Sequence, residues 1–237
     1  MNYKIHSANY VKITIFILTI TLGFIFFGFD SLLAKKNQDI FSEILKQTNV
    51  NIEECSINTS FETQIGGSAI CKKILKKLGY GDAILKVSSN KDIYCIEFSK
   101  NNYNGYIEST QHENEYDIAI NINDKCNKND LSYLKLNMEN SLEGISSGNK
   151  YFLYIKSKIA TQSISTIDSK IKTILKQNQA IDLNSVNINN GTTTTAYTGL
   201  YPSVKSGNSL MDFNYAVCRY PSGNYLIMGS PEILATY

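Results

Sequence analysis

The order of apolar and polar positions along the chain predicts alternating helices and strands. Apolar residues recur at helical spacing near residues 37–49, and strict alternation from Cys55 to Phe61 predicts a half-buried strand. Gly66-Gly67-Ser68 then offers a turn and an N-cap candidate for a helix that ends at Gly79. Four strand-like runs and a long helix follow. The runs cover residues 82–89, 91–99, 103–110 and 114–122, and the helix carries Leu131, Leu134, Met138, Leu142 and Ile145 between Asp130 and Gly148.

The second half of the chain begins with the same order of elements. Residues 151–159 alternate as a strand does, and Ser163 or Ser165 is placed to cap a helix that runs to Leu175. Strands follow from Ile181, with a flexible loop at residues 203–209 and hairpin turns at Asn189-Asn190-Gly191 and Pro221-Ser222-Gly223-Asn224. We therefore predict a pseudo-duplicated α+β fold of two antiparallel sheets, each with helices on one face. Because only the element order repeats, a coincidence of generic α+β patterning is the alternative.

One segment near the start has the length and composition of a membrane anchor. Ile13 to Phe29 contains no charged residue, Lys4 and Lys12 precede it, and Asp30 ends it. A helix of this length falls within the range that spans a bilayer, and the flanking lysines favour a cytoplasmic N-terminus. We predict an uncleaved signal anchor with a single span, which places the rest of the chain outside the cytoplasm. Cleavage would instead give a secreted protein, and a buried core helix is disfavoured because the segment has no polar stripe.

The anchor divides the chain and changes its charge balance. We assign residues 1–35 to a cytoplasmic tip and anchor, residues 36–148 to a first α+β half, and residues 149–237 to a second half with C-terminal hairpins. Beyond residue 35 the chain carries 20 basic and 20 acidic residues, and its only arginine is Arg219. Nucleic-acid binding needs a surplus of cations on one face. We therefore expect no nucleic-acid partner.

A search for catalytic, metal and cofactor motifs finds none. The two histidines are His6, before the anchor, and His112, in a polar turn. A zinc site built from histidines is therefore excluded, and a Ser-His or Cys-His pair could use only His112. The sequence has no P-loop, no dinucleotide-binding glycine motif and no Cys-x-x-Cys pair. The acidic groups at residues 53–54, 113–115 and 139–143 are typical of solvated surface. We predict no catalytic residue, no metal and no cofactor.

The five cysteines are scattered, which predicts buried free thiols. Cys71 lies on the apolar face of its helix, and Cys55 and Cys95 fall in strand patterns. One disulfide that uses the loop residue Cys126 is the alternative.

A stretch rich in threonine and tyrosine is the candidate partner-binding surface. Thr193, Thr195, Tyr197 and Tyr201 follow the first hairpin turn of the second half, and tyrosine combines a large contact area with a polar group. The alternative is that the threonines form an ordinary strand and the tyrosines cap the core.

The C-terminal segment resembles a known family. The residues that carry the resemblance are Asn208-Ser209-Leu210-Met211-Asp212-Phe213-Asn214-Tyr215-Ala216-Val217-Cys218-Arg219, followed by Leu226-Ile227-Met228-Gly229-Ser230-Pro231-Glu232-Ile233. They are similar to the YwmB-like family of spore-forming Gram-positive bacteria, and the N-terminal apolar segment and element order agree with it. The resemblance implies a TATA-box-binding-protein-like fold. It implies no DNA binding, because function belongs to a site and not to a fold name.

These observations lead to one expected function and two alternatives. We expect a non-catalytic, membrane-anchored binding or scaffold protein of the cell envelope, linked to sporulation or cell-wall remodelling, with an envelope protein or cell-wall glycan as partner. The first alternative is a cell-wall glycan hydrolase or transferase that uses a carboxylate pair. DNA binding, as the fold name suggests, is the remote alternative.

Overall fold

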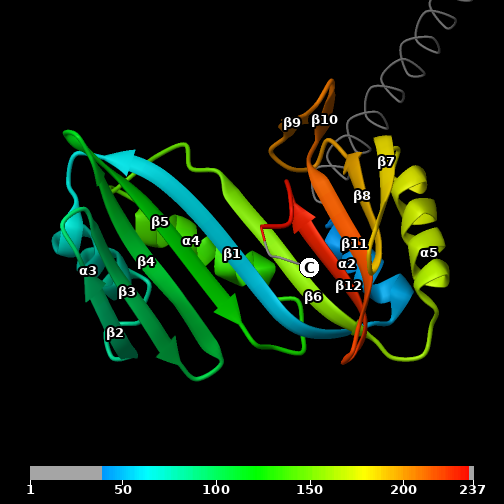
Figure 1. The fold of residues 1–237 in the computed structure, drawn as a ribbon, viewed down its shortest axis with the longest axis horizontal. Helices are drawn as coiled ribbons and strands as arrows, with labels where there is room; N and C mark the ends of the chain where they lie inside the picture. Colours follow the sequence, from blue (N-terminus) through cyan, green and yellow to red (C-terminus); the bar gives the residue numbers. More distant parts are fainter. Residues whose placement is uncertain (1–38, 235–237) are drawn as a thin grey trace, which may run out of the picture. The chain divides into compact units, whose positions relative to one another are not determined.

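The computed structural model describes residues 39–234, and the described residues from Phe41 onward form one compact α+β unit. Ten antiparallel strands make one large sheet in the order β2-β3-β4-β5-β1-β6-β12-β11-β8-β7, and β9 and β10 pair separately (Figure 1). The helices are α2 (Ile40–Thr48), α3 (Gly67–Lys77), α4 (Leu131–Leu142) and α5 (Ile164–Gln177). The strands are β1 (Asn51–Thr63), β2 (Ile84–Ser89), β3 (Ile93–Lys100), β4 (Tyr103–His112), β5 (Glu115–Asp124), β6 (Tyr151–Ile159), β7 (Ile181–Ile188), β8 (Gly191–Tyr197), β9 (Val204–Ser206), β10 (Ser209–Met211), β11 (Phe213–Tyr220) and β12 (Gly223–Ser230).

The prediction of an α+β fold is confirmed, but the prediction of two separate sheets is wrong. β1 and β6 pair antiparallel, with Cys55 opposite Ile155, so the strands of both halves join in one continuous sheet. Each half contributes five of its strands. The alternating pattern of a strand shows which side chains share a face, but it does not show which other strand lies beside it. The long-range pairing of β1 with β6 is therefore invisible to a local pattern.

Most predicted elements appear where their patterns place them. The strand predicted at residues 151–159 has those bounds in the structure, and α5 begins after Ser163, whose Oγ accepts a hydrogen bond from the Thr166 N–H at 3.1 Å. The prediction of a flexible loop at residues 203–209 is wrong, since β9 and β10 form a hairpin there. Its two-residue turn is Gly207-Asn208, and Gly207 has a φ of +61°, which glycine adopts without strain.

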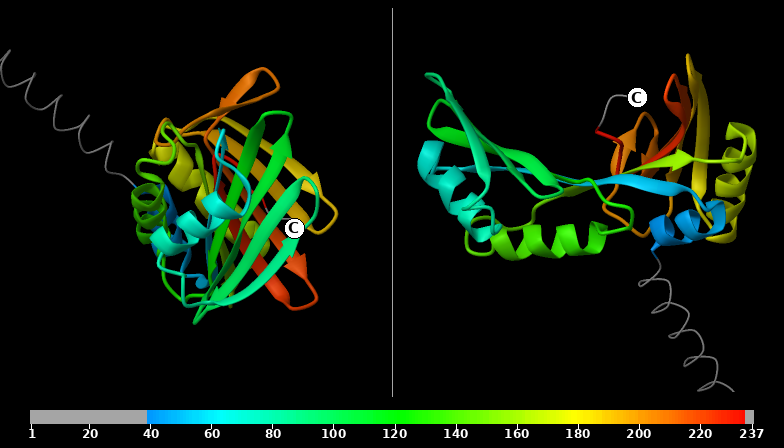
Figure 2. Two further views of the ribbon diagram at one scale, coloured as in Figure 1. Left: turned by 90° about the vertical axis from the view of Figure 1, so that its left-hand side faces the viewer. Right: turned by 90° about the horizontal axis from the view of Figure 1, so that it is seen from below.

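The helices lie along one face of the curved sheet, and the opposite face is open over its first half (Figure 2). Successive residues of a strand point to opposite faces. The face toward the helices carries buried aliphatic rows such as Ile120, Ile107 and Ile96 in the first half. In the second half, the Phe213 ring packs edge-on against Phe41 of α2 at 5.3 Å. The main core is therefore a single layer between the helices and this face.

The turn from β1 into α3 requires glycine because the chain passes close to an aromatic ring. A Cβ atom on Gly66 would fall 1.9 Å from Cγ of Tyr116 in β5, so no larger residue fits without moving that ring. The next residue, Gly67, has a φ of +65°, and its N–H donates to Ser109 Oγ at 2.9 Å. The predicted strand-to-helix turn is confirmed, although Gly66 takes the N-cap position and no side chain caps the helix there.

The predicted membrane anchor, Ile13 to Phe29, lies outside the described residues. Within residues 39–234, no helix combines the length and apolar character needed to cross a bilayer.

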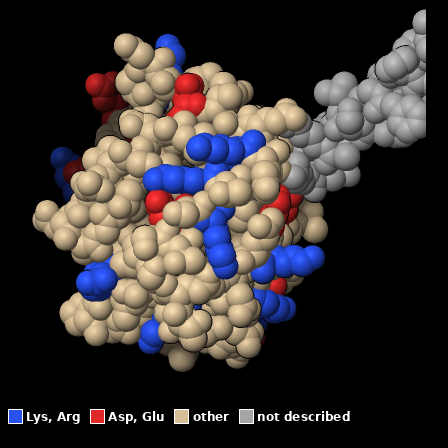
Figure 3. All heavy atoms as spheres, turned by 90° about the vertical axis from the view of Figure 1, so that its right-hand side faces the viewer, with Lys and Arg blue, Asp and Glu red and all other residues tan. Residues whose placement is uncertain are grey.

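Lysines mark the surface at the α5 end of the sheet. Figure 3 shows Lys and Arg side chains gathered on this face, with Asp and Glu between them. On α5 itself, Lys172 pairs with Asp168 at 2.8 Å and Lys170 donates to Gln162 Oε1 at 2.7 Å. This face is therefore a mixed surface and not a uniform basic patch.

One buried carboxylate organises the connection between β8 and β9. Asp212 is fully buried between β10 and β11. Its oxygens accept hydrogen bonds from the backbone N–H groups of Thr198, Leu200 and Tyr201 at 2.6, 3.1 and 3.3 Å, and from the Thr198 hydroxyl. Hydrogen bonds from several donors to one carboxylate stabilise the charge that burial would otherwise disfavour.

We predict that Asp212→Asn lowers the free energy of unfolding by about 2 to 4 kcal/mol, because an amide NH2 would face N–H donors that need an acceptor. Asp92→Asn, at an exposed turn, is the matched control and should change it by less than about 0.5 kcal/mol. Urea denaturation followed by far-ultraviolet circular dichroism measures both, since the chain contains no tryptophan. Equal midpoints for the two variants would contradict the role assigned to Asp212.

Candidate functional site

The open face of the sheet in the first half carries a row of side-chain amides. The strand registers place Asn104 of β4 opposite Asn123 of β5, Asn123 opposite Ser56 of β1, and Asn121 opposite Asn58. All five residues point away from the helices, because each is adjacent in sequence to a residue on the helix face. We call these five residues, Ser56, Asn58, Asn104, Asn121 and Asn123, the amide ladder.

The amide ladder is held together by hydrogen bonds among its own members. Asn121 Nδ2 donates to Asn58 Oδ1 at 2.8 Å and lies 3.1 Å from Ser56 Oγ. Asn123 Nδ2 donates to Asn121 Oδ1 at 2.8 Å and to Asn104 Oδ1 at 3.2 Å. At the two ends, the NH2 groups of Asn58 and Asn104 donate to no other described residue. The ladder is therefore fixed in the middle and offers donors at both ends.

A shallow hollow of about 610 Å³ covers part of this ladder and extends to the edge of the sheet. Its lining includes Tyr106, which is 38% exposed, together with Glu97 and Glu108 on neighbouring strands. Glu97 pairs with Lys86 of β2 at 3.3 Å, and both side chains are more than half exposed. The hollow thus combines amides, an aromatic ring and a nearly balanced set of charges.

The open face of the second half has a different character, because it is apolar and covered. Its buried cluster consists of Tyr154, Ala216, Cys218, Tyr225 and Ile227. Ile233, in the segment after β12, packs against this cluster, and a Cβ on Gly229 would fall within 3 Å of the backbone of residues 232–233. The C-terminal segment therefore packs over the apolar part of this half, whereas the open face of the first half is polar.

The structure brings together three of the four residues predicted to form a partner surface. Thr193, Thr195 and Tyr197 alternate along β8 and point to the open face, half-buried. Thr193 Oγ1 accepts a hydrogen bond from Asn214 Nδ2 at 3.2 Å, so this side chain also links β8 to β11. Tyr201 lies apart from them, with its ring against Phe41 on the helix side at 5.7 Å.

The titratable residues singled out in the sequence are on the surface. His112 ends β4, is 63% exposed at its side chain, and pairs with Asp117 at 3.0 Å. Glu139 pairs with Lys135 on the same helix at 3.8 Å, and Glu113 and Glu115 are exposed. None of these side chains lies in a site that excludes water.

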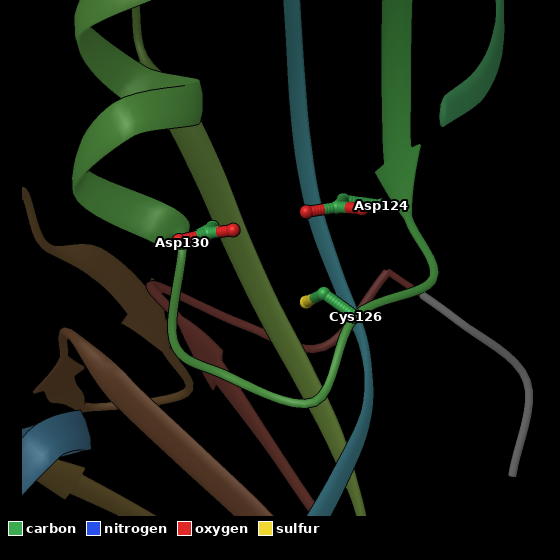
Figure 4. Close-up of side chains that lie close together, drawn as sticks. All are labelled: Asp124, Cys126 and Asp130. Atoms are coloured by element: carbon green, nitrogen blue, oxygen red, sulfur yellow. The ribbon is translucent and has the colours of Figure 1, made fainter. Parts of the chain in front are cut away.

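Two carboxylates and two thiols instead converge where β5 passes into α4. Cys55 of β1 lies opposite Asp124 in the pairing of β1 with β5. The short loop from β5 to α4 brings Cys126 and Asp130 back beside them (Figure 4). The ligand atoms of Asp124, Cys126 and Asp130 all lie within 4.8 Å of one another, and the sulfurs of Cys55 and Cys126 are 3.5 Å apart. We call these four residues the Cys-Asp cluster.

The electrostatics of the Cys-Asp cluster follow from burial. Burial raises the pKa of the Asp124 carboxyl, and the charge of Asp130 adds to this effect. Burial likewise raises the pKa values of the Cys55 and Cys126 thiols, so neither is an activated nucleophile at neutral pH. Lys128 Nζ lies 3.3 Å from Asp130 Oδ1 and is the cation nearest the cluster among the described ion pairs.

The predicted buried, free state of the cysteines is confirmed for four of the five. Cys55, Cys71, Cys95 and Cys218 are buried, Cys126 is half-buried, and all five are free. Sequence reasoning missed the amide ladder and the Cys-Asp cluster. The spacing Asn121-x-Asn123 and the run Asp124-x-Cys126-x-x-x-Asp130 were visible, but the partners on β1 were not.

We predict that Asn121→Ala lowers the free energy of unfolding by about 1 to 2 kcal/mol, since it leaves Asn58 and Asn123 without their shared partner. Asn114→Ala, in the exposed β4–β5 turn, removes the same amide where no ladder exists and should be nearly neutral. Urea titrations of both variants test this. A neutral Asn121→Ala would mean that the amides are held by water and not by one another.

Comparison with known proteins adds no assignment. No protein-family model matches the chain, and no curated protein matches it. Functional inference for this protein therefore rests on its residues and their geometry.

Proposed function

We propose that this protein is a non-catalytic, membrane-anchored binding module of the bacterial cell envelope, and that its amide ladder holds a cell-wall glycan. The observation that carries this proposal is the ordered row of amides on the open face of the first half. The anchor, Ile13 to Phe29, would keep this face outside the cytoplasm and close to the wall.

A glycan fits the ladder because its chemistry matches the free groups. The NH2 groups of Asn58 and Asn104 can donate to sugar hydroxyls or to N-acetyl carbonyls, while the fixed amides between them need little ordering on binding. Tyr106, which lines the hollow together with Asn104, offers an apolar ring for a sugar face. Neutral ligands also suit a hollow in which Lys86 already pairs with Glu97.

Nucleic acid fits this surface poorly. Glu97 and Glu108 line the hollow and would repel phosphates, and the chain beyond residue 35 carries no net charge. The lysines over α5 lie at another part of the surface, among acidic side chains (Figure 3). Counterion release would therefore contribute little to binding on the open face.

The order of elements supports a pseudo-duplicated, TATA-box-binding-protein-like arrangement as part of this proposal. The series α2-β1-α3-β2-β3-β4-β5 corresponds element by element to α4-β6-α5-β7-β8-β11-β12. In the sheet, each half runs from its second strand to its first, and the two first strands, β1 and β6, meet at the centre. The small β9–β10 hairpin is an insertion in the second series. This arrangement agrees with the YwmB-like resemblance and says nothing about DNA.

A glycan hydrolase or transferase is the second candidate, because Glu97 and Glu108 are diagonal neighbours on one open face. Diagonal Cβ atoms on adjacent strands lie roughly 7 to 8 Å apart, within the range of catalytic carboxylate pairs. The ion pair of Glu97 with Lys86 and the open surface weigh against it, since such catalysis needs an undissociated acid shielded from water.

We predict that the full chain binds purified peptidoglycan sacculi and soluble N-acetylglucosamine tetramers, and that Asn58→Ala or Asn104→Ala weakens binding about 3- to 10-fold, the worth of one hydrogen bond. Sedimentation with sacculi and calorimetry with the tetramer measure this. Asn114→Ala is the matched control, and Thr195→Ala tests the second half.

Two results would change the proposal. Binding that is equal in all four variants would show that the amide ladder is not the site. Release of soluble fragments from the sacculi, lost in Glu108→Gln, would establish the enzymatic alternative instead.

We predict that a phosphatase reporter fused after Tyr237 is active in cells and that a green fluorescent protein fused there is dark, because both respond to export. The same fusions without residues 1–35 should give the reverse pattern. Cytoplasmic fluorescence of the full chain would overturn the envelope assignment.

A further inference from the structure

The Cys-Asp cluster gathers four metal-ligand side chains from separate segments of the chain. Cys55 comes from β1 and Asp124 from the end of β5, while Cys126 lies in the connecting loop and Asp130 immediately precedes α4. We propose that these four residues bind one divalent zinc-type ion, which fixes the start of α4 to the sheet. The observations behind this proposal do not depend on glycan binding.

The donor set selects the class of metal. Thiolates with carboxylates suit zinc and similar d-block ions, whereas magnesium and calcium take oxygen ligands. In a tetrahedral zinc site, with metal–ligand distances near 2.0 to 2.3 Å, the ligand atoms lie roughly 3.2 to 3.8 Å from one another. The Cys55 and Cys126 sulfurs, at 3.5 Å, already have this spacing. The ligand atoms of Asp124, Cys126 and Asp130 all lie within 4.8 Å of one another, and the Cys55 sulfur joins this group through its contact with Cys126, so the ion would draw all four ligands closer.

Burial gives an independent reason to expect a cation. Asp124 is only 2% exposed, and among the described residues no lysine or arginine forms an ion pair with it. Its hydrogen-bonding neighbours, Cys126 and Asp130, both belong to the cluster. Lys128 forms its ion pair with Asp130, and its charge also acts on Asp124 from a greater distance. Buried carboxylates are normally paired with a cation or coordinate a metal, so the cluster has one positive charge fewer than its two carboxylates need.

The groups around the cluster also suit metal ligands. Asp130 precedes α4 but its side chain makes no capping hydrogen bond, which leaves the carboxylate to face Asp124 and Cys126 (Figure 4). Instead, Asn129 Oδ1 accepts from the Leu131 N–H at 3.2 Å. The Cys126 and Cys55 thiols both donate to the backbone oxygen of Lys128, at 3.0 and 3.4 Å. These contacts hold both sulfurs against the loop, and the thiols would release these protons when they ligate a metal.

The role that follows is structural. α4 packs across β1 and β6, the two strands at the centre of the sheet. An ion bound by Asp130, the residue before α4, would tie the loop at residues 124–130 to β1. Because metal ligation in such sites adds directly to folding stability, the ion should raise the midpoint of thermal unfolding.

The test is metal binding by the full chain, purified with a phosphine reductant and stripped with a chelator. We expect one equivalent of Zn²⁺ by competition with a chromophoric chelator, and a Co²⁺ complex with sulfur-to-metal charge-transfer absorption. Cys126→Ser, at a half-buried loop position, should lose about half of that absorption and weaken zinc binding at least about 10-fold. Asp130→Asn should weaken zinc binding while keeping the absorption. Cys95→Ser is the control and should match the parent chain.

Three outcomes would overturn the proposal. The first is a chain that, when purified without reductant, is 2 Da lighter and yields a Cys55–Cys126 cross-linked peptide, which would assign the sulfurs to a disulfide. The second is a Co²⁺ spectrum unchanged in Cys126→Ser, and the third is thermal stabilisation by calcium or magnesium but not by zinc. Circular dichroism of each variant shows whether it folds. Sacculus binding, measured separately, keeps failure here distinct from failure of the glycan proposal.

Discussion

The antiparallel pairing of β1 with β6 is the constraint on which the rest of the structure depends. Both strands are interior to the sheet, so each fixes two neighbours, and the registers on either side align side chains in rows across all the strands. One such row on the helix face runs from Asp124 through Cys55 to Ile155. A shift of one residue would exchange the two faces and expose the aliphatic core. Burial of that core under the helices therefore also holds the polar groups of both sites in place.

The two halves use the open face of the same sheet differently. In the second half, tyrosine and aliphatic side chains make this face apolar, and the C-terminal segment covers it through Ile233. In the first half, asparagine and serine satisfy one another along the ladder, so the face is stable in water without a cover. A polar network that is satisfied internally, with donors left only at its ends, is preorganised for a polar ligand. The two halves thus share a similar topology, but the second half has an apolar cluster covered by Ile233 and the first half has an exposed polar face.

The local elements could be predicted from the sequence, but their assembly could not. β6 and the Ser163 cap of α5 follow from period-two alternation and from capping chemistry within a few residues. The merger of two expected sheets depends on a pairing between residues about 100 positions apart, for which a single sequence carries no signal. The same limit hid both sites, since Asn58 and Cys55 come from β1 and their partners from β4, from β5 and from the loop after β5. The β9–β10 hairpin was missed for a local reason: its strands are only three residues long.

The two sites share a stretch of backbone, so an ion bound in the cluster would act on the ladder. Ser56 follows Cys55 on β1, and Asn123 precedes Asp124 on β5, so adjacent residues present the ladder on one face and the cluster on the other. An ion bound by the cluster would hold the ends of these strands and limit the twisting that would separate Asn123 from Ser56. The coupling can act only over the Ser56 and Asn123 end of the ladder, because Asn58 and Asn121 lie further along the strands. Such an ion would then reduce the entropy that the near end of the ladder loses on binding, while contributing no contact to the ligand itself.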